Sequence, residues 1–270
     1  MQIEVATHLG RVAVTTQGSG PLVVLVPAAG RAAADFDPIM PALAQRYRVA
    51  ALDWPGTGAS PPADRPRDAT AAAFASVLGD VIRALGEPAV VVGHSVGGFA
   101  AARLAVDEPD RVLGLVLVDA LGFLPFGRIQ RAFCAVKGVP TVTRVVEGYL
   151  ARAQTIRRNT HTANVFARVD AALAERSFVE ITAALWRSFP HPESDLREAG
   201  KAIRCPTLVC WGWFDPVVPV LGAFTAARTI PGAQLSLFRT GHTPFVEDTD
   251  GFLRAVEPFL SRLVVDRAVA

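Results

Sequence analysis

Short apolar runs recur along most of the chain, and segments with helical spacing separate them. The runs at Leu22–Val26, 90–92 and Val112–Val118 consist almost entirely of valine and leucine, which is typical of strands buried on both faces. Between the first two runs, residues 70–85 carry apolar side chains at helical spacing. This alternation predicts an α/β fold with a mostly parallel sheet flanked by helices.

The same pattern predicts further elements at both ends of the chain. Two loosely alternating segments at 3–7 and 11–16 predict a hairpin, because a turn at Leu9-Gly10 separates them. The remaining predicted elements are a helix at 38–46, strands at 47–52, 207–211 and Gln234–Phe238, and helices at Leu221–Thr229 and 252–265.

Residues 122–200 interrupt the alternation with consecutive helical segments and no buried strand. We interpret 1–121 and 201–270 as one α/β core and 122–200 as an inserted helical cap, or lid. Functional residues of parallel sheets gather at the carboxyl ends of the strands, so the cap is expected to cover that edge and to set specificity.

Composition excludes several classes of protein. A net charge of +2 gives no whole-chain reason to expect nucleic acid as a partner. No apolar run approaches the ~20 residues of a transmembrane segment, and the N-terminus has no signal-peptide pattern. Cys134, Cys205 and Cys210 lack metal or redox spacing. We therefore expect a cytoplasmic protein that acts on a small molecule without metal or cofactor, and we consider a homodimer as one candidate assembly.

The segment Gly93-His94-Ser95-Val96-Gly97 follows a buried strand and passes directly into a helical segment. A Gly-x-Ser-x-Gly sequence in that context predicts a sharp strand–turn–helix elbow with the serine exposed at its tip. His94 should then point away from the side that Ser95 faces. Taken alone, the motif is equally typical of an ordinary glycine-rich turn, so the rest of the chain must decide between a catalytic and a structural serine.

Four motifs together supply that context. They are Gly93–Gly98, Asp53-x-Pro55-Gly56-x-Gly58-x-Ser60, Gly212-Trp213-Phe214-Asp215 and Gly241-His242. With them the chain resembles serine hydrolases of the α/β-hydrolase fold over almost its whole length, apart from the variable cap. The resemblance implies a nucleophile at Ser95, an acid at Asp215 and a base at His242, in the chain order of that family.

One alternative for the acid stays open. Asp119 also ends a strand, the one that follows the nucleophile's strand, and some members of the family place their acid there. The neighbouring Gly212-x-x-Asp215 pattern favours Asp215. Asp53 is interpreted as a structural residue of its glycine-rich loop.

The oxyanion hole is expected to combine the amide of Val96 with one from the loop after Leu22–Val26. Many relatives carry His-Gly in that loop, where this chain has Pro27-Ala28. Pro27 has no N–H to donate. Aligning the loops places the second donor at Ala29, with Ala28 as the next candidate.

The cap suggests a substrate pocket and a basic surface. We expect Phe123, Phe126 and Trp186 to line an apolar pocket, although aromatic residues at helical spacing also occur in ordinary cores. The first half of the cap is basic, which favours either a solvated outer face or attraction of anionic substrates or a membrane. The basic residues are Arg128, Arg131, Lys137, Arg144, Arg152, Arg157, Arg158 and Arg168.

Three functions fit these features. The first is a cofactor-independent serine hydrolase that cleaves a carboxylic ester of a small, largely apolar substrate through an acyl-enzyme. The second is a carbon–carbon bond hydrolase that uses the same three residues on a diketone-like substrate. The third is a non-catalytic relative that only binds a ligand, because one fold serves unrelated functions.

Overall fold

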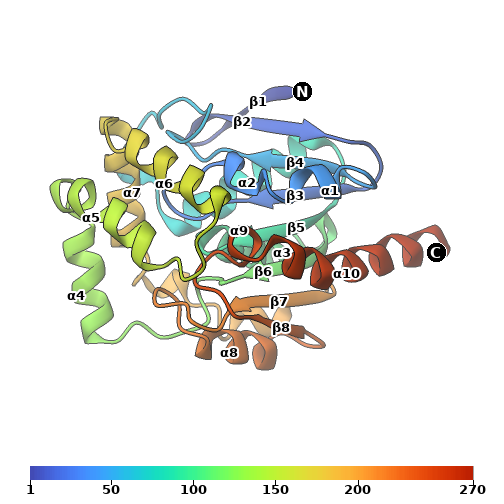
Figure 1. The fold of residues 1–270 in the computed structure, drawn as a ribbon. Helices are drawn as coiled ribbons and strands as arrows, with labels where there is room; N and C mark the ends of the chain where they lie inside the picture. Colours follow the sequence, from blue (N-terminus) through green and yellow to red (C-terminus); the bar gives the residue numbers. More distant parts are fainter. Residues whose placement is uncertain (270) are drawn as a thin grey trace.

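The computed structural model describes the backbone of residues 1–269 and the side chains of residues 1–263, and it contains one eight-stranded sheet. The strands lie in the order β1-β2-β4-β3-β5-β6-β7-β8 (Figure 1). Their bounds are β1 Gln2–Thr7, β2 Gly10–Gln17, β3 Leu22–Val26, β4 Arg48–Leu52, β5 Ala89–His94, β6 Val112–Val118, β7 Thr207–Gly212 and β8 Gln234–Phe238.

The sheet is parallel except at one edge. β1 and β2 form the expected hairpin, and β2 also pairs antiparallel with β4. Every other neighbouring pair is parallel, from β4 through β8. The strand ends of β3, β5, β6, β7 and β8 therefore meet at one edge, where parallel sheets bind ligands.

Helices cover both faces because the buried strands present apolar side chains to each side. In β3, Val24 and Val26 belong to a core cluster shared with α2 (Ala71–Leu85), α3 (Val96–Asp107) and α8 (Leu221–Thr229). Val23 and Leu25 belong to the opposite cluster, which includes residues of α1, α9 and α10. Those helices span Met40–Leu43, Pro244–Glu247 and Thr249–Val269.

The predicted helix at 38–46 is much shorter in the structure. A 3-10 turn at Ala33–Phe36 precedes the single-turn helix α1 (Met40–Leu43). After α1, the N–H groups of Gln45 and Arg46 form i to i+3 hydrogen bonds, and the Tyr47 N–H forms an i to i+4 bond to Leu43, so the regular α-helical pattern is lost. Apolar spacing alone did not reveal this early end.

Four helices occupy the segment between β6 and β7. They are α4 (Arg128–Lys137), α5 (Pro140–Ala153), α6 (Thr160–Ala172) and α7 (Arg176–Ser188). Figure 1 shows them stacked beyond one end of the sheet, on the side toward which β7 points. Among residues 1–269, no helix combines the length and apolar character needed to cross a membrane.

Candidate active site

Ser95 lies on the sharp turn between β5 and α3. Its backbone has φ 55° and ψ −115°, an unusual conformation for a residue with a side chain. A Cβ added to Gly93 would collide with the Gly97 carbonyl, and one added to Gly97 would collide with the carbonyl of Val26. Both glycines are therefore required for strand β5, helix α3 and the end of β3 to approach so closely.

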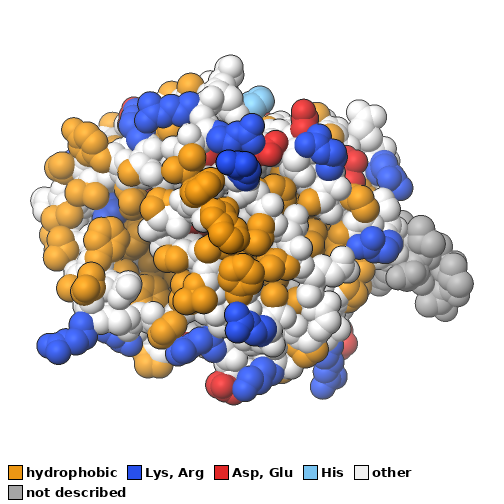
Figure 2. All heavy atoms as spheres, turned by 60° about the horizontal axis from the view of Figure 1, so that its bottom comes forward, with side chains coloured by type: hydrophobic (Ala, Val, Ile, Leu, Met, Phe, Trp, Pro, Cys, Tyr) orange, Lys and Arg blue, Asp and Glu red, His pale blue; other side chains and the backbone are white. Residues whose placement is uncertain are grey.

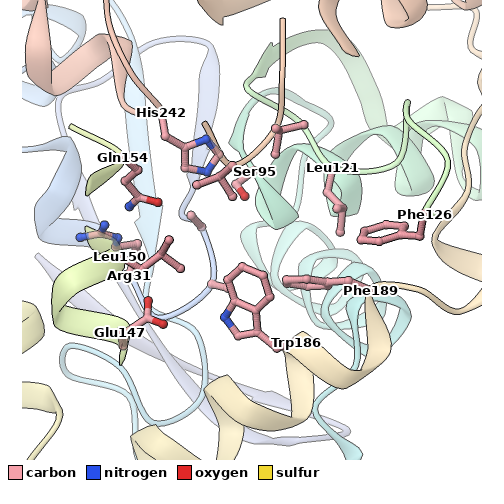
Figure 3. Close-up of a pocket in the computed structure, with 14 residues that line it drawn as sticks. Arg31, Ser95, Leu121, Phe126, Glu147, Leu150, Gln154, Trp186, Phe189 and His242 are labelled. Carbon is pink, nitrogen blue, oxygen red and sulfur yellow. The ribbon is translucent and has the colours of Figure 1, made fainter. Parts of the chain in front are cut away.

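Backbone hydrogen bonds hold the strained turn in place. The Ser95 N–H donates to the Val118 carbonyl at 2.8 Å, and the Ser95 carbonyl accepts from the Leu121 N–H at 3.0 Å. Because β6 and the residues just after it hold the turn on both sides, the side chain of Ser95 has a defined direction. It faces a small cavity of about 70 Å³, where His242 lies beside it (Figure 3).

His242 is paired with Asp215 behind Ser95. The His242 Nδ1 lies 2.6 Å from the Asp215 Oδ2, and both side chains are buried. The other carboxylate oxygen, Oδ1, accepts hydrogen bonds from the backbone N–H groups of Val217 at 2.7 Å and Val218 at 3.1 Å. The carboxylate is thus fixed toward Nδ1, which leaves Nε2 for a proton transfer on the cavity side.

Asp119 lies beside this pair but does not bond to the histidine. Its Oδ1 accepts a hydrogen bond from the Gly212 N–H at 2.9 Å, and its side chain is fully buried. Burial, with the nearby Asp215 carboxylate as a second cause, raises the pKa of Asp119 well above its usual value. The raised pKa favours the neutral form of Asp119 relative to an ordinary aspartate.

Asp119, Asp215 and His242 also place one potential metal-ligand atom each within 4.8 Å of one another. Ligand atoms around a metal ion each lie about 2.0–2.2 Å from it. The 2.6 Å contact between the His242 Nδ1 and the Asp215 Oδ2 instead joins these two atoms directly. The cluster therefore fits a hydrogen-bonded acid–base pair better than a metal site.

Two further groups position His242, and this role of theirs was not predicted from the sequence. The His242 N–H donates to the Gln154 carbonyl at 2.9 Å, at the end of α5. His94 places its Nε2 2.7 Å from the His242 carbonyl. Burial lowers the pKa of His94 well below its usual value, so the ring is neutral and donates its Nε2 proton to that carbonyl. His94 thus supports the loop that carries His242.

Glu247 connects the same loop to the α5–α6 connection. Its buried carboxylate accepts from the N–H groups of Ile156 and Arg157, both at 2.8 Å, and from Gly241 at 3.0 Å. An acidic residue directly after the apolar run Pro244-Phe245-Val246 was the sequence signal for this role. The loop of His242 and the α4–α7 segment are therefore fixed to each other.

The expected oxyanion donors border the cavity at the start of α3 and after β3. Ala28 and Ala29 both line it beside Ser95, and the Val96 N–H lies in the first turn of α3. Within residues 1–269, none of these three N–H groups donates to a protein acceptor. The Pro27 carbonyl accepts from Trp54 Nε1 at 2.7 Å, which fixes the loop. Preorganised, unpaired amides of this kind suit a developing oxyanion.

The match to known proteins agrees with this geometry. A model of the alpha/beta hydrolase family matches residues 23–255, which is most of the chain. The chain belongs to the alpha/beta hydrolase family.

Individual relatives of this alpha/beta hydrolase are moderately similar. An uncharacterised protein of Mycobacterium tuberculosis is 31% identical over 94% of this chain and 79% of its own length. A pimeloyl-(acyl-carrier protein) methyl ester esterase of Shewanella sp. is 27% identical over 97% of this chain and 99% of its own. The structure of a hydrolase from Pseudomonas aeruginosa PA01 matches with a TM-score of 0.81 at 25% identity, over 96% of this chain and 98% of that one. The protein is thus a hydrolase with esterases among its relatives.

The cavity of this alpha/beta hydrolase has an apolar wall that includes two of the three expected aromatic residues. Phe126 and Trp186 line it as anticipated. Phe123 does not, and this expectation is corrected: its side chain is fully buried in the main core, beside Gly200. The other apolar lining residues are Leu121, Leu150, Phe189, Val217 and Val218.

The basic residues of the cap are mostly engaged. Four of them pair with carboxylates: Lys137 with Glu147, Arg152 with Asp170, Arg157 with Asp248 and Arg168 with Asp35. Arg131 and Arg144 donate to backbone carbonyls. Figure 2 shows a broad band of hydrophobic side chains across one face of the molecule, with Lys and Arg mainly toward its margins. Apart from the buried pair of Lys137 and Glu147, these pairings favour the interpretation as an ordinary solvated face.

Proposed function

We propose that this hydrolase is a serine esterase in which Ser95 is the nucleophile, His242 the general base and Asp215 the residue that orients the base. One observation carries the proposal: Ser95 faces the same cavity as His242, whose Nδ1 is bonded to the Asp215 carboxylate at 2.6 Å. A serine hydroxyl needs such a base to attack at neutral pH. No cofactor is required.

The reaction proceeds in two halves. The Ser95 hydroxyl attacks the ester carbonyl while His242 Nε2 takes its proton, and Asp215 stabilises the resulting imidazolium. The tetrahedral intermediate collapses when His242 returns that proton to the leaving alcohol, which gives an acyl-enzyme on Ser95. Water, deprotonated by His242, then attacks the acyl group and restores Ser95.

We assign the oxyanion hole to the N–H groups of Val96 and Ala29. Their support is the position of both groups at the cavity and the absence of protein acceptors for them within the described residues. Ala28 shares both properties, so Ala29 is preferred on the alignment of its loop with the family pattern.

Replacing Ala29 with proline tests this assignment, because proline deletes the N–H and adds little bulk. We expect Ala29→Pro to lower kcat by about 10²–10³-fold, the usual cost of losing one oxyanion donor. The measurement is steady-state ester hydrolysis by protein whose thermal unfolding is still cooperative.

Ala28→Pro is the matched control, since it places the same ring one residue earlier in the loop. A greater loss in Ala28→Pro than in Ala29→Pro would move the donor to Ala28. Near-normal kcat in both folded variants would place the second donor outside this loop.

We further propose that residues 122–200 act as a lid over the site. Leu150 of α5 and Trp186 of α7 line the cavity together with Ser95, and Glu247 fixes the α5–α6 connection to the loop of His242. The cavity of about 70 Å³ is small beside the ~300–1,000 Å³ of typical ligand sites. Substrates larger than a few atoms therefore require the lid to shift.

The bond that is cleaved is proposed to be a carboxylic ester with a largely apolar acid part. The esterases among the relatives support this class, as does the apolar wall formed by Leu121, Phe126 and Phe189. A cytoplasmic location and a homodimer remain further proposals, which fractionation and sedimentation measurements test.

A substrate panel tests ester cleavage against carbon–carbon cleavage. We expect short-chain 4-nitrophenyl esters to be hydrolysed with a burst of nitrophenol equal to the enzyme concentration whenever the acyl-enzyme breaks down more slowly than it forms. Vinylogous diketones should stay intact under the same conditions. Turnover of the diketones without any ester hydrolysis would replace the proposal with a carbon–carbon hydrolase.

A further inference from the structure

Arg31 is a buried cation at the cavity that the proposed mechanism does not use. It follows the loop of Ala28 and Ala29 and lines the same cavity as Ser95. Arg31 as a whole is only 4% exposed, and its Nη1 is buried without a hydrogen-bond partner within the described part of the chain. Buried guanidinium donors are normally paired, because leaving one unpaired costs its full desolvation.

The carboxylates near Arg31 make their hydrogen bonds to other cations. Asp35 is the nearest, with its Oδ2 at 4.0 Å from the Arg31 Nε, which is a long ion-pair contact and too long for a hydrogen bond. Arg168 holds the Oδ1 of that same carboxylate at 2.8 Å. Glu147 also lines the cavity, but its Oε2 lies 2.5 Å from the buried Lys137 Nζ. Each acid is therefore bonded to another cation at hydrogen-bond distance, whereas Arg31 has only the long contact to Asp35.

A second unpaired donor faces the same cavity. The Nε1–H of Trp186 is buried and has no acceptor among the described residues. In Figure 3 its indole nitrogen lies on the side of Glu147 and Arg31, whereas Leu121, Phe126 and Phe189 occupy the other side. Ser95 and His242 lie between the two sides. The cavity thus has one polar end, where the Arg31 and Trp186 donors lie near the Lys137-paired Glu147 carboxylate, and one apolar end.

We propose that Arg31 binds a carboxylate of the substrate and that the Trp186 Nε1–H assists as a second donor. This inference rests on the proposed esterase function and narrows its substrates to esters that carry a free carboxylate, such as half-esters of dicarboxylic acids. A guanidinium presents parallel donors that match the two oxygens of a carboxylate. The apolar end would take the hydrocarbon part of the substrate.

Paired substrates and paired variants test the subsite. Monomethyl succinate, glutarate and adipate are each compared with the methyl ester of the monoacid of equal chain length, by titrating the released acid. We expect the wild-type kcat/KM to favour the half-esters. Arg31→Met should lower the ratio of half-ester to neutral-ester kcat/KM by about 10–100-fold, as for a charge-assisted hydrogen bond.

Further variants separate recognition from folding. Arg31→Lys should recover part of the half-ester preference in kcat/KM, because lysine keeps the positive charge but lacks the paired N–H donors of a guanidinium. Trp186→Phe should lower the ratio only a few-fold. Arg176→Met is the control, since Arg176 is exposed on α7 and pairs with Glu180; it should leave the ratio unchanged. Arg31→Met should also keep or raise Tm, whereas an arginine with a structural role would lower Tm when removed.

A binding measurement keeps this inference separate from the proposed function. Calorimetry with Ser95→Ala protein should detect monomethyl glutarate, and adding Arg31→Met should weaken that binding by at least tenfold. If the wild type hydrolysed no ester but this binding were intact, the proposed esterase function would be contradicted and the Arg31 subsite would still be supported. An unchanged substrate ratio in Arg31→Met together with unchanged binding would overturn the subsite and leave the esterase.

Discussion

Replacing Ser95 with alanine should reduce ester hydrolysis by about 10⁶-fold, to the level that binding and the oxyanion hole alone provide. The nucleophile, base and acid act as a unit, so removing the first makes the other two useless for acyl transfer. The Ser95 side chain makes no hydrogen bond to another described residue, so its truncation to alanine removes no hydrogen bond from the fold. The measurement is kcat for a 4-nitrophenyl ester, with Tm as the check on folding.

Ser95→Gly is a useful companion variant. The φ of 55° at this residue strains any residue with a Cβ but not glycine. We therefore expect Ser95→Gly to be as inactive as Ser95→Ala and to have the higher Tm of the two. An alanine variant that stays folded and keeps more than a hundredth of the wild-type kcat would remove Ser95 from the reaction.

Replacing Asp215 with asparagine should lower kcat by about 10⁴-fold, as comparable replacements do in other triads. The amide would turn an NH₂ group or a weaker acceptor toward His242 Nδ1, so the ring would lose its favoured tautomer and its stabilised imidazolium. Since the Val217 and Val218 N–H groups bond the Oδ1 of Asp215, the asparagine oxygen should stay there and present the NH₂ group to His242.

Asp119→Asn is the matched control for Asp215→Asn. Burial raises the pKa of Asp119 well above its usual value, and asparagine is a neutral side chain of the same shape. Its oxygen can still accept the hydrogen bond from Gly212. We expect a loss far smaller than that of Asp215→Asn. If Asp119→Asn proved the more damaging variant, the acid would have to be moved to Asp119.

Much of the fold could be predicted because its signals are local. Strands buried on both faces read as continuous apolar runs, and β3, β6 and β8 have the predicted bounds. The elbow was recognisable because close approach of β5 and α3 demands glycine at fixed spacing around Ser95. The family's chain order and the position of these residues after predicted strands then indicated Asp215 as the acid and His242 as the base, although 27 residues separate them.

The missed features depend on contacts between distant segments. Phe123 has the composition of a pocket residue, but only packing decides that it faces the core near Gly200 instead. Glu247 gains its role from backbone N–H groups about 90 residues earlier in the chain. From the sequence alone, Arg31 is indistinguishable from an ordinary surface arginine. Only the structure shows that Arg31 is buried and that Arg168 is bonded to Asp35. No local periodicity encodes such relations.

The most direct test of Ser95 as the nucleophile is covalent labelling with a fluorophosphonate, followed by mass spectrometry of the peptides. Such a probe reacts with a serine only where an adjacent base activates it. We predict one adduct per chain, on the peptide that contains Ser95, and no adduct in folded Ser95→Ala protein. Labelling of the Ser95→Ala variant at the wild-type rate, or an adduct on another serine of the wild type, would contradict this mechanism.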